Sequence, residues 1–149
     1  MKFVILLGIM RIMINYINGD IFDSNCYYLV NPVNTVGVMG KGLAAHFKYK
    51  YPDMFEQYKY KCSRGEIKVG KVTIIDNIIL FPTKEHWKYP SKLSYIEEGL
   101  IDMLRYKKCS IAMPAIGCGL GGLPWDKVKS LIETYYNKEG YLDVYLPDD

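Results

Sequence analysis

Short apolar runs alternate along this chain with polar turns and with longer segments that have the hydrophobic periodicity of helices. Continuous or β-branched apolar runs predict strands, and an apolar stripe along a longer segment predicts a helix. We expect strands over residues 11–17, 27–30, 72–75, 78–81, 110–113 and 142–146. We expect helices over residues 43–50, 53–62, 91–107 and 125–136, the third capped by Ser91. Strands that alternate with helices in this way predict an α/β fold.

Two polar, glycine-rich loops each join a predicted strand to a predicted helix. The second, residues 114–125, holds Gly117, Gly119, Gly121 and Gly122 within six residues. Glycine has no Cβ and tolerates φ > 0, so such a loop can turn several N–H groups onto one ligand. The helix that follows adds its unpaired N–H groups and its positive dipole end. The pattern predicts a phosphate or pyrophosphate site, and a flexible surface loop is the alternative.

The first glycine-rich loop, residues 31–42, holds three glycines, two asparagines and a lysine. A third loop, residues 82–90, follows a predicted strand and is rich in side chains that bind or react. In an α/β sheet such loops gather at one edge, where ligands bind. The glycine spacing matches neither the dinucleotide-binding fingerprint nor the P-loop, so neither a standard dinucleotide-binding fold nor a P-loop fold is expected.

The composition is that of a single globular domain over residues 1–149, with half of its residues hydrophobic. The net charge of +3 suits an anionic ligand, but by itself it is too small to establish a nucleic-acid partner. The four cysteines are scattered, with no CxxC pair, which argues against zinc and disulfides and favours a reducing cytoplasm. We expect no metal and no cofactor, and Cys118 is interpreted as a space-filling residue rather than a nucleophile.

The first ten residues are apolar, but they lack a small-residue cleavage site and are too short to span a bilayer. We expect either an extra edge strand over residues 1–10 or a true start downstream, at Met10 or Met13. No other segment suggests contact with a membrane.

Three segments resemble the macrodomain family, which binds ADP-ribose. Residues 19–21 are similar to the family's adenine-recognising turn, residues 31–42 to its first ligand loop and residues 116–122 to its diphosphate loop. The resemblance covers nearly the whole chain beyond residue 10. It implies a three-layer α/β/α fold with a mixed central sheet.

Within the family, residues 33–42, 81–87 and 117–123 resemble the branch of DarG-like DNA ADP-ribosylglycohydrolases and terminal ADP-ribose glycohydrolase. In that branch a lysine in a Thr-Lys loop is catalytic, and Lys84 has that position here. The human enzyme of the branch has an assisting aspartate in its diphosphate loop, where this chain has Gly121. Glycine at this position is typical of the DarG-like pattern.

Lys84 must be neutral for part of the time if it is to act as a nucleophile, which requires a lowered pKa. Lys41 and Lys88 could supply the positive charge that lowers it, and Trp87 could exclude water. We expect Lys84 to attack the anomeric carbon of the distal ribose or to stabilise it electrostatically. An ordinary solvated lysine is the alternative.

The resemblance also implies roles in ligand binding. Asp20 would accept a hydrogen bond from the adenine amino group, Tyr145 would cover the adenine face, and Asn34 would bind the distal ribose. An Asx turn or helix cap, ordinary packing and a turn-stabilising asparagine are the respective alternatives. The residues expected to contact ADP-ribose are Asp20, Ile21, Asn34, Gly40, Lys41, Gly42, Thr83, Gly117, Cys118, Gly119, Leu120, Gly121, Gly122 and Tyr145.

The expected substrate is ADP-ribosylated thymidine in single-stranded DNA, with an antitoxin or counter-defence role. Basic residues in the middle of the chain could follow a phosphate backbone or form a solvated helix face: Lys48, Lys50, Lys59, Lys61, Arg64, Lys68 and Lys71. A glutamate or aspartate ester of ADP-ribose on protein is a competing substrate. A non-catalytic ADP-ribose reader and an ADP-ribose-1″-phosphatase are alternative functions. A monomer is the default.

Overall fold

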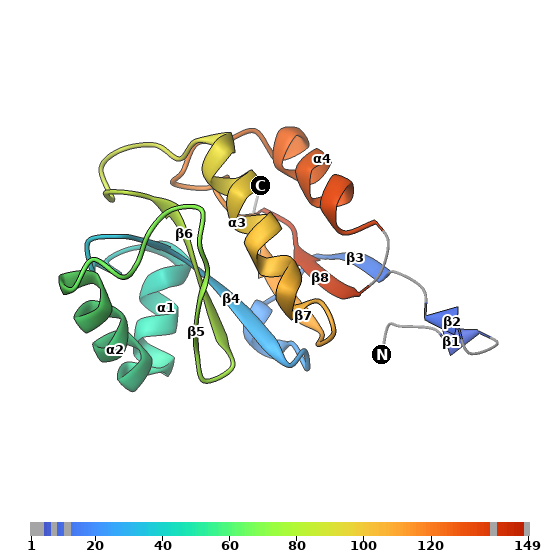
Figure 1. Cartoon of the computed structure of the whole chain (residues 1–149), viewed down its shortest axis with the longest axis horizontal. Helices are drawn as coiled ribbons and strands as arrows, with labels where there is room; N and C mark the ends of the chain where they lie inside the picture. The colour runs from blue at the N-terminus through green and yellow to red at the C-terminus, as the bar shows by residue number, and fades with distance from the viewer. Residues whose placement is uncertain (1–4, 7–8, 11–12, 138–139, 148–149) are drawn as a thin grey trace.

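The computed structural model describes residues 5–6, 9–10, 13–137 and 140–147 (Figure 1). The strands are β1 (Ile5–Leu6), β2 (Ile9–Met10), β3 (Met13–Ile17), β4 (Tyr28–Asn34), β5 (Thr73–Ile75), β6 (Ile78–Lys84), β7 (Ile111–Pro114) and β8 (Tyr141–Tyr145). The α-helices are α1 (Gly42–Lys50), α2 (Pro52–Ser63), α3 (Leu93–Met103) and α4 (Trp125–Tyr135). Two short 3-10 helices are η1 (Ile21–Asp23) and η2 (Leu104–Tyr106).

A six-stranded sheet in the order β3-β8-β7-β4-β6-β5 forms the centre of the molecule. Its strands pair in parallel except for β5, which is antiparallel to β6. The antiparallel pair is the hairpin expected around residues 76–77, where Asp76 takes a positive φ of 55°. The predicted mixed sheet is therefore confirmed. The strands β6, β4 and β7 are neighbours, so the segments that follow them begin at one edge of the sheet.

Each face of the sheet carries a separate apolar core, because successive side chains of a strand point to opposite faces. Val30 of β4 lies in a core with Ile96 of α3 and Ile132 of α4. Its neighbour Leu29 lies in the other core, with Phe47 of α1 and residues of α2. Figure 1 shows α3 and α4 together, away from α1 and α2. The three-layer α/β/α fold is confirmed.

Strands β4 and β6 extend further than the sequence predicts. Each continues through a proline, Pro32 or Pro82, to end at Asn34 and at Lys84. Proline has no N–H and usually ends a strand in a sequence-based interpretation. Here the two strands pair with each other over this stretch, with a register shift between Val33 and Asn34. Residues expected in loops therefore lie at strand ends.

The third helix also differs from the prediction. Helix α3 begins at Leu93 with Lys92 at its N-cap, and η2 replaces its expected last turn. Ser91 does not cap the helix: it is buried, and its hydroxyl donates to the carbonyl of Thr83.

At the N-terminus, the described strands β1 and β2 pair only with each other, so they form a separate two-stranded sheet and do not extend the main one. The other residues of the predicted edge strand lie outside the described part. Among the described residues, no helix has the length and apolar character needed to cross a membrane.

Candidate functional site

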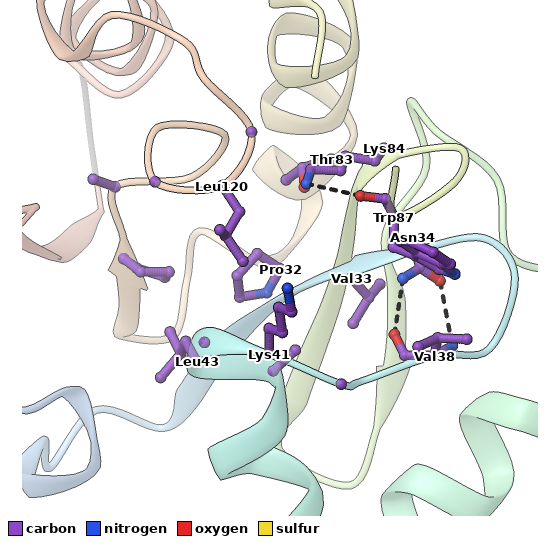
Figure 2. Close-up of a pocket in the computed structure, with 17 residues that line it drawn as sticks. Pro32, Val33, Asn34, Val38, Lys41, Leu43, Thr83, Lys84, Trp87 and Leu120 are labelled. Atoms are coloured by element: carbon purple, nitrogen blue, oxygen red, sulfur yellow. Dashed lines mark hydrogen bonds between the residues drawn. The ribbon is translucent and has the colours of Figure 1, made fainter. Parts of the chain in front are cut away.

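A cavity of about 560 Å³ opens at the edge of the sheet where β4, β6 and β7 end (Figure 2). The two glycine-rich loops and the start of α1 complete its wall. Its lining residues are Pro32, Val33, Asn34, Val38, Gly40, Lys41, Gly42, Leu43, Ala44, Thr83, Lys84, Trp87, Pro114, Ala115, Gly119, Leu120 and Gly121. The sequence thus predicted correctly that the two glycine-rich loops lie at one site.

The second glycine-rich loop closes on itself through backbone hydrogen bonds. The Gly122 N–H donates to the Cys118 carbonyl at 3.0 Å, and the Leu123 N–H donates to the Gly117 carbonyl at 2.9 Å. These two N–H groups are therefore used within the loop. Among the described residues, no protein acceptor pairs with the N–H groups of Gly119, Leu120 and Gly121, which all line the cavity. Three successive unpaired N–H groups form a cradle for an anion.

The N-terminus of α1 forms the opposite wall. Gly42, Leu43 and Ala44 line the cavity, and no side chain caps the helix at Lys41. The unpaired N–H groups and positive dipole end of this helix therefore face the same space as the glycine cradle. Gly42 has φ +61°, and a Cβ added there would lie 3.7 Å from Leu120 Cδ1, so the two loops approach closely. Helix α4, expected to supply a dipole, does not line the cavity with its first turn.

Lys84 reaches the cavity from the end of β6. Its side chain is half-buried, and this burial lowers the pKa of its amine below the ordinary lysine value. The amine Nζ lies 3.5 Å from the carbonyl oxygen of Trp87, as Figure 2 shows. Burial is the cause of the shift, whereas the sequence suggested help from the charges of Lys41 and Lys88. Lys88 instead places its amine 5.7 Å from the centre of the Tyr89 ring.

Asn34 lines the cavity, but its side chain already has partners in the first glycine-rich loop. Its Oδ1 accepts from the Val36 N–H at 3.0 Å and from the Tyr58 hydroxyl at 2.8 Å. Its Nδ2 donates to the Val38 carbonyl at 2.8 Å. This geometry favours the turn-stabilising alternative, and contact with a ribose stays a prediction.

The residues expected around adenine lie beyond the cavity, on the side of β3 and β8. One Asp20 carboxylate oxygen accepts from the Phe22 N–H at 2.9 Å, which is the capping alternative. Ile21 and Tyr145 are buried in the same apolar core. Tyr145 is the register partner of Pro114, which lines the cavity, so this group lies one strand away from it. A ligand longer than the cavity would extend in this direction.

Gly121 leaves no room for a side chain. A Cβ at this position would collide with the backbone carbonyl of Gly117, across the turn of the loop. Among the described residues that line the cavity, only Lys41 and Lys84 have ionisable side chains. The wall of this site therefore offers amines and N–H donors and no carboxylate. No group of His, Cys, Asp or Glu side chains in the described part of the chain could hold a metal ion.

Cys118 packs against one of the apolar cores, and burial raises the pKa of its thiol to about 11. A thiol with this pKa carries almost no thiolate at neutral pH, so it is a poor nucleophile. The space-filling interpretation agrees with this position.

Ser91 does not line the cavity but connects two parts of its wall, a role that the sequence did not predict. Its hydroxyl donates to the Thr83 carbonyl, and its N–H donates to the Gly121 carbonyl at 3.0 Å. Ser91 thus links strand β6, which ends at Lys84, with residues 119–121 of the second glycine-rich loop. The apolar lining was missed as well, at Pro32, Val33, Val38, Leu43, Ala44, Pro114 and Ala115. The only signal for these residues in the sequence is that they lie in or next to the predicted glycine-rich loops.

The chain is similar to proteins of known family. The macro domain family model matches residues 30–132. The DNA ADP-ribosyl glycohydrolase of Mycobacterium tuberculosis is 44% identical over 138 residues, which cover 85% of this chain and 39% of that protein. This chain therefore spans about two fifths of the length of that curated relative.

Solved structures are similar in fold and in sequence. The macrodomain of Mycobacterium tuberculosis DarG has a TM-score of 0.84 and 42% identity, over 91% of this chain and 99% of that one. Thermosipho africanus DarTG in complex with ADP-ribose has a TM-score of 0.82 and 36% identity, over 99% of this chain and 43% of that one.

Proposed function

Because this chain belongs to the macro domain family, we propose that it binds ADP-ribose in the cavity and hydrolyses an ADP-ribosyl bond. The proposed substrate is thymidine in DNA that carries ADP-ribose. Relatives at 44% and 41% identity, from Mycobacterium tuberculosis and Thermus aquaticus, are named DNA ADP-ribosyl glycohydrolases. An antitoxin or counter-defence role follows if the modification is made by a toxin.

The observation that carries this proposal is the half-buried amine of Lys84 in a cavity without a carboxylate. Among the described lining residues, Lys41 and Lys84 alone can ionise, and Lys84 has a lowered pKa. A nucleophilic or basic amine must be neutral, and burial raises its neutral fraction at a given pH. Lys84 is therefore the best candidate for the chemical step.

The two N–H walls suit the diphosphate of ADP-ribose. With the diphosphate between the cradle of residues 119–121 and the start of α1, the distal ribose would face the ends of β4 and β6, where Lys84 lies. The Lys84 nitrogen would form a bond to the ribose anomeric carbon while the bond from that carbon to the base breaks. The base leaves with the electron pair and takes a proton from water, and water then releases the sugar from the lysine. A protonated lysine would instead repel the positive charge that develops on the sugar.

Substitution of Lys84 tests the proposal. Lys84→Ala should abolish release of ADP-ribose from a modified thymidine oligonucleotide. Its affinity for free ADP-ribose, measured by calorimetry, should stay within about tenfold, or about 1.4 kcal/mol. Lys108→Ala is the matched control, because Lys108 is exposed, does not line the cavity and lies before the start of β7, at the other end of this strand from the cavity. Full activity of Lys84→Ala would remove the lysine from the mechanism.

The same assay separates the competing functions. Glutamate-linked ADP-ribose on protein and ADP-ribose-1″-phosphate are given to the wild type beside the modified oligonucleotide. Turnover of the protein ester alone would identify a protein deacylating enzyme, and turnover of the phosphate alone a phosphatase. Binding of ADP-ribose without turnover of any substrate would identify a reader.

A further inference from the structure

The segment between β6 and α3 exposes an aromatic cluster at the mouth of the cavity. Trp87 and Tyr89 are 56% and 57% exposed. The centre of the His86 ring lies 4.9 Å from that of Trp87 and 5.7 Å from that of Tyr89. Single exposed rings are common on protein surfaces, but several rings gathered in one patch beside a cavity indicate a binding surface.

Both ends of this segment are held by hydrogen bonds. The Glu85 carbonyl accepts from the Thr35 hydroxyl at 2.6 Å, and Ser91 is joined to Thr83 and to Gly121. Within the segment, the Tyr89 N–H donates to the His86 carbonyl at 3.1 Å. The rings are therefore presented by an anchored turn, which reduces the entropy lost when a ligand stacks on them.

The cluster begins at the catalytic lysine and leads outward. Trp87 lines the cavity, and its carbonyl oxygen is the group 3.5 Å from Lys84 Nζ. Tyr89 does not line the cavity and lies further along the turn. A polymer attached to the ribose at Lys84 would leave the cavity next to these rings.

Positive charge accompanies the rings. Lys88 lies over the Tyr89 ring at 5.7 Å, and the Lys92 amine lies 5.6 Å from the centre of the Tyr95 ring. The one acid in residues 85–92 is Glu85, which accepts a hydrogen bond from the Tyr95 hydroxyl at 2.8 Å. No ion pair in the described part of the chain involves these two lysines.

The basic residues of α2, by contrast, are paired with acids. Lys59 lies 3.3 Å from Glu56, and Lys61 lies 3.7 Å from Glu66. Arg64, next to the helix, lies 2.7 Å from the same Glu66. The charge of this helix is therefore partly neutralised, which makes it a weaker track for a phosphate backbone.

We propose that residues 86–92 form a platform for the single-stranded DNA that flanks the ADP-ribosylated nucleotide. Bases stack on Trp87 and Tyr89, and the amines of Lys88 and Lys92 contact the adjacent phosphates. Alternating aromatic and basic side chains are how proteins bind single strands without sequence preference. The proposal rests on the proposed function, since it names the polymer that brings the modified base to Lys84.

The test compares a long and a short substrate of the same enzyme. One is an ADP-ribosylated oligonucleotide of roughly ten nucleotides, and the other is the ADP-ribosylated mononucleoside. Tyr89→Ala should raise KM for the oligonucleotide about 5- to 100-fold, with kcat unchanged. KM for the mononucleoside should be unaffected. Tyr49→Ala is the control, because Tyr49 is 81% exposed on α1, away from the cavity.

Affinity for the unmodified oligonucleotide, measured by fluorescence anisotropy, tests the same surface without turnover. Replacing Lys88 and Lys92 with glutamine should lower the slope of log affinity against log salt by about 1.4, or about 0.7 for each lost phosphate contact. Tyr89→Ala should weaken this binding as well, and Tyr49→Ala should not.

Equal KM values of wild type and Tyr89→Ala on the oligonucleotide would overturn the platform while leaving the glycohydrolase intact. Absence of turnover on both substrates would overturn the proposed function, and the anisotropy measurement would still decide the platform. A Tyr89-dependent KM for ADP-ribosylated protein, without one for the oligonucleotide, would make this surface a protein-docking site and reject the DNA proposal.

Discussion

Lys84 illustrates how position alone changes the chemistry of a side chain. It is one of many lysines in this basic chain, yet it ends β6 half-buried at the cavity, next to the Trp87 carbonyl. Burial disfavours the charged amine and lowers its pKa. The sequence could place a lysine in a reactive loop, but the burial of its amine depends on segments far away in the chain.

The lowered pKa predicts how activity depends on pH. In the proposed mechanism the neutral amine is the reactive form, so kcat should rise as pH increases through the pKa of Lys84 and level off above it. This rising limb should have its midpoint below about 10.4, the value of an unperturbed lysine. Lys84→Arg should lack the limb, since a guanidinium stays protonated. A kcat that falls over the same pH range would contradict the role of a neutral lysine.

Tyr58 is the residue on which the first glycine-rich loop depends. It is fully buried in α2, and its hydroxyl lies 2.8 Å from both the backbone carbonyl oxygen and Oδ1 of Asn34. Tyr58→Phe removes the donor and leaves these buried oxygens with fewer partners. We expect the free energy of unfolding to fall by about 1–3 kcal/mol, measured by urea denaturation.

The matched control for Tyr58→Phe is Tyr49→Phe, which removes an exposed hydroxyl and should change stability by less than about 0.5 kcal/mol. Affinity for ADP-ribose should fall in Tyr58→Phe as well, because Asn34 orders the wall of the cavity. If Tyr58→Phe and Tyr49→Phe unfold with the same free energy, the buried Tyr58 hydroxyl does not stabilise the fold.

At the scale of elements, two glycines of the second glycine-rich loop differ in the space available for a side chain. A Cβ at Gly121 would collide with the Gly117 carbonyl, whereas a Cβ at Gly119 would meet no atom within 4 Å. Gly121→Ala should therefore destabilise the fold by about 1–3 kcal/mol, through backbone strain in the loop. Gly119→Ala should stay within about 0.5 kcal/mol in the same thermal unfolding measurement. If Gly119→Ala were the less stable of the two variants, the loop would have another conformation.

This loop also shows what the sequence can and cannot predict. Clustered glycines between a strand and a helix predict an anion site, and the structure shows that this loop lines a cavity. Which N–H groups face the ligand depends on how the loop hydrogen-bonds to itself. The sequence treats Gly119 and Gly122 alike, whereas the N–H of Gly122 is used within the loop.

The ends of β4 and β6 were mispredicted for a related reason. Pro32, Pro82 and the polar residues that follow them have the composition of loops, so local propensity ends both strands early. Pairing of the two strands with each other carries them on to Asn34 and Lys84. Tertiary contacts override local preference here, and they bring the two predicted site residues into register at the edge of the sheet.

At the scale of the whole molecule, the strand order assembles the site. The segments that follow β4, β6 and β7 are far apart in the sequence, but these strands are neighbours and run in the same direction. An alternation of strands and helices predicts such an edge in general terms. It does not predict the order of the strands, which places the first glycine-rich loop, after β4, between the second, after β7, and strand β6, which ends at Lys84.

A ligand that touches all three segments should stabilise the whole fold. ADP-ribose at about 100 times its dissociation constant should add about 2.7 kcal/mol to the free energy of unfolding, because it binds only the folded chain. For a domain of this size the melting temperature should rise by about 5–10 °C, measured by calorimetry. Lys84→Ala should keep this shift, since in the proposed binding mode backbone N–H groups hold the diphosphate. Adenosine, which has no diphosphate, should give a much smaller shift at the same concentration. Equal stabilisation by adenosine and ADP-ribose at the same concentration would contradict the diphosphate site. The diphosphate on the two N–H walls must account for most of the difference in affinity between these ligands.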